Sequence, residues 1–319
     1  MSNALPDSIS IIDGHYYFEG RAAAYLIQDG DEAAFVDNIT RFSVPHLLSA
    51  LEQRGLTPEQ VKYAIVTHIH LDHSGGTAEL MKQCPNATVL CHPRAARHII
   101  DPSKLVASAK PIYGEEAFNK LYGEIEAVED SKVRIVEDEE TVTLGSRTLT
   151  FMDTPGHARH HHSIHDDNTN TIFSGDAFGT GYQQLQGGTA PFMNYVCAPP
   201  EFDPQAAIST IKRLAEHGAD RILATHFGAS PDIQACAEQQ IKALNRFEQL
   251  ARDTADSDLE GDALQEHCVT QVSAIINNEL KACGLDPSDA EVSKWSTTEL
   301  SITSQGIAAL AGRMRAGKY

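Results

Sequence analysis

Residues 67–76 read THIHLDHSGG, and this stretch decides how the rest of the chain is interpreted. The six residues before it, VKYAIV, are apolar or β-branched and predict a buried strand over 61–66. The paired glycines at its end predict a tight turn into a helix over 77–84. Between strand and helix lie four potential metal ligands: His68, His70, Asp72 and His73. Imidazole and carboxylate groups together suit zinc, iron or manganese, so the stretch predicts a metal site.

Composition sets the class of protein and excludes some partners. The chain has 319 residues, of which 41% are hydrophobic and 22% charged, as in a soluble globular protein with one large domain and an appendage. Lys and Arg number 25 against 44 Asp and Glu, a formal charge of -19 that argues against a nucleic-acid partner. No apolar window could span a membrane, and the N-terminus MSNALPDSIS lacks signal-peptide features. The six cysteines form no C-x-x-C pair, so we expect free thiols and a cytoplasmic location.

The pattern along the chain predicts two β regions followed by helices. Residues 9–37 predict an antiparallel meander, and Asp37 closes a buried strand in it, either as a turn or helix N-terminal residue or as a group that steadies the metal-bearing loop. Further strands are expected at 87–91, 133–136, 141–144, 147–153, 171–174 and 220–224. Helices are expected at 44–54, 94–100, 115–122, 203–217, 233–252, 263–283 and 303–315. We therefore expect a metal-binding domain over 1–230 and a helical C-terminal extension over 231–319.

Three more potential ligands each follow a predicted strand directly: His157 in TPGH, Asp176 in SGD and His226 in TH. Ligand sites of open α/β sheets gather at one edge of the strands, so these residues are expected to join the first cluster. Seven ligands are enough for two metal ions, but spacing alone does not fix how the ions share them.

These motifs together resemble the metallo-β-lactamase superfamily over residues 9–230. The resemblance implies an α/β fold, the four-layer αββα sandwich. It implies a first metal held by His68, His70 and His157, a second held by Asp72, His73 and His226, and a bridge at Asp176. It also places Asp37 where the superfamily has an aspartate that supports the ligands. Stretches such as CHPRAARHIIDPSKL and ATHFG are similar to a prokaryotic stand-alone subgroup without a settled substrate.

The resemblance implies a metal-dependent hydrolase with two zinc ions, iron or manganese being alternatives. A metal-bridging hydroxide would attack a small ester, thioester, lactone or phosphoester, and Asp72 would orient it and carry the proton to the leaving group. Three other interpretations stay open: an iron-dependent persulfide dioxygenase, another redox member of the superfamily, or a metal-bearing effector that binds a ligand without turnover. Flavodiiron members usually carry Glu where His70 stands.

Other residues have less decisive patterns. His160 and His161 are expected beside the ligands or at the surface, and His162 and His165 at the surface. His92 and Tyr195 are candidates to donate to a substrate oxygen, with ordinary packing as the alternative. The Gly-rich loop 178–195 either lines a pocket or simply connects. Apolar faces of the extension, with Trp295 as an anchor, are expected to pack on the sandwich rim or on a second copy in a homodimer.

Overall fold

The computed structural model describes residues 5–319, which fall into two compact units. The first unit consists of Met1–Asp153 (described from residue 5), His160–Gly175 and Asp220–Gly228. The second consists of Thr154–Arg159, Asp176–Ala219 and Ala229–Tyr319. These compact units are not divided at residue 230, and the predicted domain boundary there stays a prediction.

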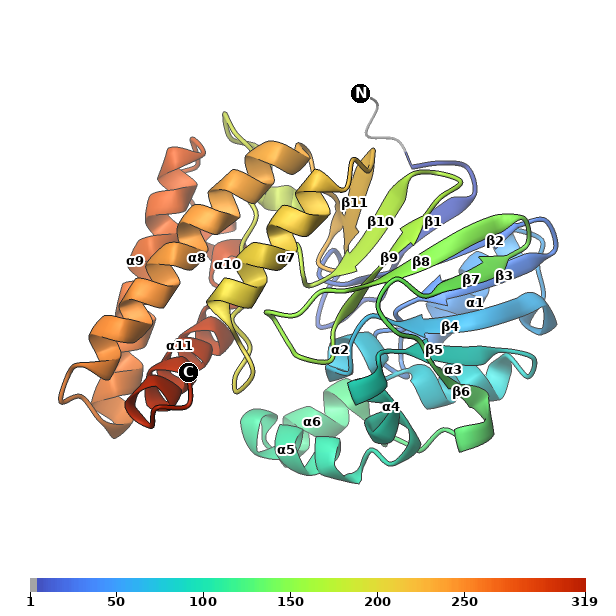
Figure 1. Ribbon diagram of the computed structural model, residues 1–319, viewed down its shortest axis with the longest axis horizontal. Helices are drawn as coiled ribbons and strands as arrows, with labels where there is room; N and C mark the ends of the chain where they lie inside the picture. Colours follow the sequence, from blue (N-terminus) through green and yellow to red (C-terminus); the bar gives the residue numbers. More distant parts are fainter. Residues whose placement is uncertain (1–4) are drawn as a thin grey trace. The chain divides into compact units, whose positions relative to one another are not determined.

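The first sheet belongs to the first unit and has six strands in sequence order (Figure 1). They are β1 (Ile9–Asp13), β2 (Ala23–Asp29), β3 (Glu32–Val36), β4 (Val61–Val66), β5 (Thr88–Cys91) and β6 (Val133–Ile135). β1 to β3 are antiparallel, and β3 to β6 are parallel. The carboxyl ends of β3 and β4 therefore meet at one edge, which brings the residues after Val36 and Val66 together.

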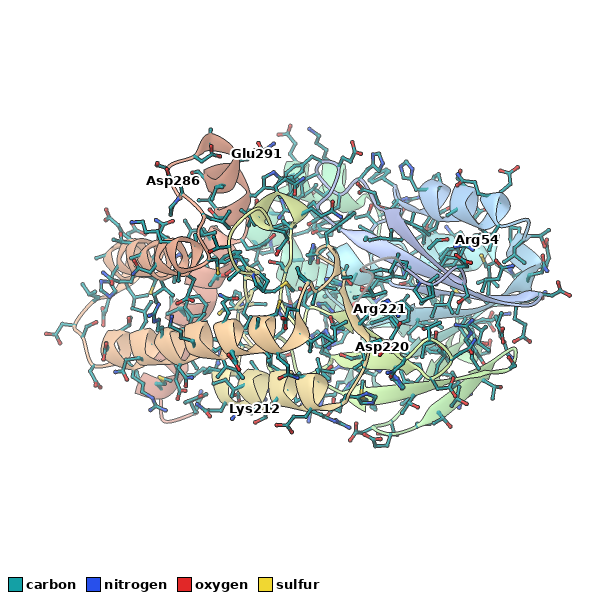
Figure 2. All side chains as sticks on the ribbon, turned by 90° about the horizontal axis from the view of Figure 1, so that it is seen from above. Arg54, Lys212, Asp220, Arg221, Asp286 and Glu291 are labelled. Carbon is teal, nitrogen blue, oxygen red and sulfur yellow. The ribbon has the colours of Figure 1, made fainter. Side chains whose placement is uncertain are left out.

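Helices of the first unit carry apolar faces toward this sheet. They are α1 (Val44–Gln53), α2 (Leu71–Ser74), α3 (Thr77–Gln83), α4 (Pro93–Ile100), α5 (Ser103–Tyr113) and α6 (Glu115–Tyr122), with short 3₁₀ turns at Pro58–Gln60 and Asp130–Lys132. In α1, Leu47 and Leu51 recur at helical spacing and pack into the same core as Phe35 of β3. After α1 ends, Arg54 donates to Ser10 Oγ at 2.8 Å, which ties this helix to β1 (Arg54 is labelled in Figure 2).

The second sheet also has six strands, in the order β12-β11-β10-β9-β8-β7. They are β7 (Thr141–Leu144), β8 (Arg147–Asp153), β9 (His162–Asp166), β10 (Thr171–Gly175), β11 (Arg221–Ala224) and β12 (Gly228–Ala229). β10 and β11 are parallel, whereas β7 to β10 are antiparallel. Because β10 and β11 run in the same direction, the residues after Gly175 and Ala224 emerge at one edge.

β9 corrects the prediction that His162 and His165 lie at the surface. His162 is only 2% exposed, and its Nε2 lies 2.8 Å from the carbonyl oxygen of Val66. Burial lowers the pKa of His162 to about 3, with a smaller contribution from His92. His165 is half-buried, with its Nε2 3.0 Å from Asn170 Oδ1. Both side chains are therefore part of the packed sheet.

The second unit is mainly helical. Its helices are α7 (Pro204–Glu216), α8 (Ile233–Ala255), α9 (Gly261–Ala282), α10 (Ala290–Ser296) and α11 (Leu300–Arg315), and a 3₁₀ turn lies at Gln183–Leu185. Asp203 caps α7 by accepting from Gln205 N and Ala206 N. Trp295, the expected anchor, lies on α10 and is 3% exposed, and its ring centroid lies 5.0 Å from that of Tyr182. It anchors α10 within this unit.

The predicted fold class is confirmed, with two mixed sheets, flanking helices and further helices in the C-terminal part of the chain. Among residues 5–319, no helix has the length and apolar character needed to cross a membrane.

Candidate metal centre

The loop after β4 is shaped by its glycines and by the short helix α2. His70 precedes α2, and Asp72 and His73 lie in its single turn. A Cβ on Gly76 would lie 2.7 Å from the carbonyl oxygens of both Asn38 and Thr40. Only a residue without a side chain fits this close approach to the segment after β3. The glycines thus let the loop rest on that segment.

Asp37 is the buried carboxylate on which this loop is built. It is 0% exposed and accepts hydrogen bonds from Thr67 N at 2.9 Å, Thr67 Oγ1 at 2.9 Å and Thr225 Oγ1 at 2.8 Å. His73 Nδ1 lies 2.7 Å from Asp37 Oδ2. A carboxylate that accepts the Nδ1 proton fixes the tautomer in which Nε2 carries the lone pair, as in carboxylate–histidine–metal arrangements. Asp37 therefore holds the His73 ring so that its Nε2 is left to bind a metal ion.

His226 reaches the same place from the second sheet. It follows β11 directly, and its Nδ1 lies 2.7 Å from the carbonyl oxygen of Arg21, while its Nε2 lies 3.5 Å from Asp72 Oδ2. One ligand atom from each of Asp72, His73 and His226 lies within 4.8 Å of the other two. We call these residues the Asp72–His73–His226 group, and its donors suit a divalent metal ion.

His68 and His70 form a neighbouring pair in the first unit. His68 Nε2 lies 3.0 Å from His70 Nδ1, and His68 Nδ1 lies 3.2 Å from Thr67 Oγ1. The His68 ring lies with its centroid 4.0 Å from that of His73. Two nitrogens about 3 Å apart are spaced roughly as two ligands of one ion at ~2.0–2.1 Å from each nitrogen. The pair can therefore serve one ion.

The remaining two predicted ligands, His157 and Asp176, lie in the second unit. His157 Nε2 lies 3.5 Å from Asp176 Oδ2, and His157 Nδ1 lies 2.9 Å from the carbonyl oxygen of Val196. Both residues are buried, with 2% and 5% exposure. The seven predicted residues thus form two groups, five in the first unit and two in the second.

His160 and His161 surround the His68–His70 pair. The His160 ring lies 5.4 Å from the His70 ring, and the buried His161 ring stacks on His68 at 4.8 Å between centroids. A Cβ on Gly175 would lie 2.7 Å from His161 Nε2, so this ring packs directly against the glycine. These two histidines help to fill the space beside the ligands.

Two candidate donors to substrate, His92 and Tyr195, have surroundings that agree with the packing interpretation. His92 caps α4, because its Nδ1 accepts from Arg94 N at 3.0 Å, and its Nε2 lies 3.0 Å from Asp153 Oδ1. Both ring nitrogens of His92 therefore serve the fold. Tyr195 is 1% exposed in the second unit, and burial, more than the nearby Cys197 and Asp176, raises the pKa of its phenol.

Thr67, Thr225 and the backbone of Arg21 also belong to the centre, although the motifs do not predict them. Thr67 and Thr225 both donate to Asp37, and each directly precedes a predicted ligand histidine. The repeated Thr-His pair after a strand was the available signal. Nothing in the sequence marks the Arg21 carbonyl, because any residue could supply it.

The sequence profile described as the metallo-beta-lactamase superfamily matches residues 18–226, and the chain belongs to this family. The predicted family is thereby confirmed.

Three curated relatives illustrate its range. The metallo-beta-lactamase fold-containing protein ST1585 of Sulfurisphaera tokodaii is 29% identical over 197 residues, covering 60% of this chain and 69% of that protein. The human acyl-coenzyme A thioesterase MBLAC2 is 26% identical over 197 residues, covering 56% and 66%. The nitric oxide reductase of Moorella thermoacetica is 31% identical over 166 residues, covering 46% and 35%. The family thus includes both hydrolytic and redox enzymes.

The crystal structure of ST1585 from Sulfolobus tokodaii resembles the chain with a TM-score of 0.62 and 22% identity, over 95% of this chain and 99% of that one. This likeness supports the fold.

Proposed function

We propose that the protein is a metal-dependent hydrolase with two zinc ions. His68, His70 and His157 would hold one ion, Asp72, His73 and His226 the other, and Asp176 would bridge them. The observation that carries the proposal is the Asp72–His73–His226 group, whose ligand atoms lie within 4.8 Å of one another while Asp37 holds His73 Nδ1 at 2.7 Å.

The hydrogen bonds of the histidines fit bound metal ions. Four of the five proposed histidine ligands place Nδ1 against an oxygen: Thr67 Oγ1 for His68, Asp37 for His73, Val196 O for His157 and Arg21 O for His226. Such outer contacts set the ring orientation and the tautomer of metal-binding histidines. The pattern supports the proposed ligand set in both units.

Chain connectivity supports a role for Asp176 beside the first unit's ligands. Gly175 ends β10, and a Cβ built on it would lie 2.7 Å from Thr67 Oγ1, next to His68 in sequence. Asp176 is the following residue, so the peptide bond limits how far it can lie from that loop.

Metal ions bound in such a site lower the pKa of bound water to ~7 and polarise a carbonyl or phosphoryl oxygen. The chain's own contribution to proton transfer falls to Asp72. Its side chain keeps 23% of its surface accessible, whereas those of His73 and His226 keep 0% and 4%. Asp72 would therefore orient the nucleophile and pass a proton between the site and solvent.

The proposed substrates are small esters, thioesters, lactones or phosphoesters. The relative named as an acyl-coenzyme A thioesterase supports this range. The test is a panel of these four classes with metal-loaded protein. We expect one class to be hydrolysed, activity to disappear with a chelator, and zinc to restore it. If the zinc-loaded protein hydrolyses none of the panel, the hydrolase proposal is wrong.

A redox function is the second candidate, because a relative named as a nitric oxide reductase is 31% identical over 166 residues. An iron-dependent oxygenase of this family would consume oxygen with a persulfide substrate. Iron-loaded protein that consumes oxygen, together with zinc-loaded protein inactive on the ester panel, would favour this function over hydrolysis.

A further inference from the structure

The segment between β1 and β2 is held in an unusual backbone conformation beside the candidate metal centre. Asp13 accepts from His15 N at 2.9 Å and from Gly20 N at 2.7 Å. His15 and Tyr17 have φ angles of 52° and 61°, in the left-handed region that side chains disfavour. Such strain persists where the surrounding fold fixes it, and it often occurs at ligand sites. These contacts fix the backbone of the segment and therefore the positions of Tyr16 and Tyr17.

Three tyrosines of the first unit meet next to this segment. Tyr16 Oη and Tyr122 Oη lie 2.5 Å apart, and the Tyr113 ring lies 5.4 Å from the Tyr122 ring. Packing alone would be served by phenylalanine, as it is by Phe118, whose ring centroid lies 5.4 Å from that of Tyr122. Three phenols placed together add hydrogen-bond donors to this corner.

The phenols also lie within electrostatic reach of Asp72. Burial raises the pKa of Tyr16, Tyr113 and Tyr122, and the charge of Asp72 raises each of them further. For Tyr113 the pKa rises to about 12. All three phenols therefore keep their protons at neutral pH. One of the Tyr16 and Tyr122 hydroxyls donates to the other, so the cluster can offer fewer than three donors to a ligand.

Arg21 adds a positive charge to the same corner. Its guanidinium carbon lies 4.6 Å from the centroid of the Tyr17 ring and 5.4 Å from that of Tyr16. Its carbonyl oxygen holds His226 Nδ1, so this residue is tied to the Asp72–His73–His226 group. A guanidinium stacked by its face directs its N–H groups sideways, which suits a carboxylate or phosphate. The chain has a formal charge of -19, so its overall field repels anions. A fixed guanidinium at this position would give an anionic ligand a local positive partner.

We propose that Arg21 and Tyr113, supported by the buried Tyr16 and Tyr122, form a subsite that binds an oxyanion of the substrate, a carboxylate or a phosphate, beside the Asp72–His73–His226 group. We call it the phenol–arginine subsite. This inference rests on the proposed function, and it narrows the substrates to esters or thioesters that carry a second, negatively charged group. The reacting bond would lie at the metals and the oxyanion at the subsite.

The test compares two esters of equal chain length, the mono-4-nitrophenyl ester of adipic acid and 4-nitrophenyl hexanoate, with metal-loaded protein. Arg21→Gln and Tyr113→Phe should each raise KM for the adipate ester by about tenfold, the usual effect of losing a hydrogen bond to a charged group. KM for the hexanoate ester should change less than about twofold, and the metal content should not change.

The first sheet offers two matched control residues, Arg134 and Tyr63. Arg134→Gln removes an exposed arginine of β6 that pairs with Glu140, and Tyr63→Phe removes a phenol of β4. Neither control should alter KM for either ester. Equal KM changes on both esters, or no change on the adipate ester, would overturn the subsite.

A binding measurement separates failure of the subsite from failure of the hydrolase proposal. If the wild-type protein hydrolyses neither ester, calorimetric titration of the metal-loaded protein with adipate and with inorganic phosphate still tests the subsite. We expect the wild-type protein to bind adipate or inorganic phosphate, and Arg21→Gln to weaken this binding about tenfold. The tighter ligand identifies the group as carboxylate or phosphate. Equal binding by wild type and variant, or no binding of either ligand, would contradict the inference.

Discussion

The carboxylate of Asp37 accepts hydrogen bonds from side chains that follow two strands of different sheets. Thr67 directly follows β4, and Thr225 directly follows β11. The third side chain, His73, lies in α2. One buried charge thus positions residues on both sides of the Asp72–His73–His226 group. Its burial is offset by the donors that surround it.

Replacing Asp37 with Asn should weaken both stability and metal binding. The amide cannot accept all of these hydrogen bonds, so buried donors are left without a partner, at a cost of about 1–3 kcal/mol. Loss of the bond to His73 should lower metal affinity by about 10–100-fold. Denaturant unfolding and competition with a chromophoric chelator measure the two effects.

Asp166→Asn is the matched control for this variant. Asp166 is also 0% exposed and pairs with Arg147 Nη1 at 2.6 Å, and it accepts further hydrogen bonds from Asn168 N and Thr169 Oγ1. The Asp166→Asn variant should be less stable than wild type but bind metal with the same affinity. Equal losses of affinity in both variants would show that Asp37 acts only through stability.

His162 should make the protein sensitive to acid. Its folded-state pKa is about 3, below the ordinary value of ~6.5, so the unfolded chain binds the proton more readily. The stability from the neutral ring is present above pH ~6.5 and is lost as pH falls toward 3, by at most ~1.4 kcal/mol per pH unit. His162→Leu should therefore gain stability relative to wild type between pH 7 and pH 5. A difference in unfolding free energy that stays constant with pH would contradict this origin.

Residue patterns in the sequence were enough to propose the ligands but not their supports. Asp72, His73 and His226 could be proposed because each belongs to a motif that directly follows a predicted strand. The roles of Thr67 and the Arg21 carbonyl depend on three-dimensional proximity, which short-range patterns do not encode. His162 was misplaced because a histidine suggests exposure, whereas its hydrogen bond to Val66 O makes burial tolerable.

The loop from β4 to α3 is the element whose geometry the centre depends on most. Gly76→Ala would bring a methyl group within 2.7 Å of the Asn38 and Thr40 carbonyls, which are backbone and cannot rotate away. We expect a loss of about 1–3 kcal/mol and weaker metal binding, because the loop must move relative to Asp37. Denaturant unfolding and metal competition again provide the measurements.

Gly312→Ala is the control for this substitution. Gly312 lies within α11, and a Cβ there would meet nothing within 4 Å. Alanine favours helix more than glycine does, so stability should be unchanged or rise by up to ~1 kcal/mol. If Gly76→Ala behaved like this control, the close approach of the loop would not matter.

Most elements could be predicted because their periodicity is strong. The bounds of β4, β7, β8 and α6 agree with the prediction. β9 was missed because its sequence, HSIHD, holds three titratable residues and does not alternate as an apolar strand does. α5 was missed because Pro111 lies inside it and its apolar residues, such as Leu105, Val106 and Ala109, pack on the core only partly buried. Both misses come from sequences whose local pattern conflicts with their place in the fold.

At the scale of the whole chain, residues 231–319 form one compact unit with earlier segments. Leu244 and Phe247 of α8 and Leu310 of α11 are buried in this unit, and Gly306 of α11 packs closely on the carbonyl of Cys197. A chain ending at residue 230 would expose the apolar surface that these helices cover. We expect it to be less soluble or to change its substrate preference.

The truncated chain should still bind metal in its folded fraction, because all seven proposed ligands precede residue 231. Size-exclusion chromatography isolates that fraction, and elemental analysis measures its metal. A folded, monodisperse fraction unable to hold metal under conditions where the full chain does would show that the C-terminal helices are needed for the metal centre itself.

We propose that the centre holds two metal ions bridged by Asp176. Elemental analysis of the full chain, purified without chelator and then reconstituted with zinc, tests it most directly. We predict about two zinc ions per wild-type chain, and at most about one in Asp176→Ala, which should remain folded but lose activity. Fewer than one ion per wild-type chain after reconstitution would show that the centre does not hold two metal ions. An Asp176→Ala variant that keeps two ions and turnover within about tenfold of wild type would show that Asp176 is not the bridge.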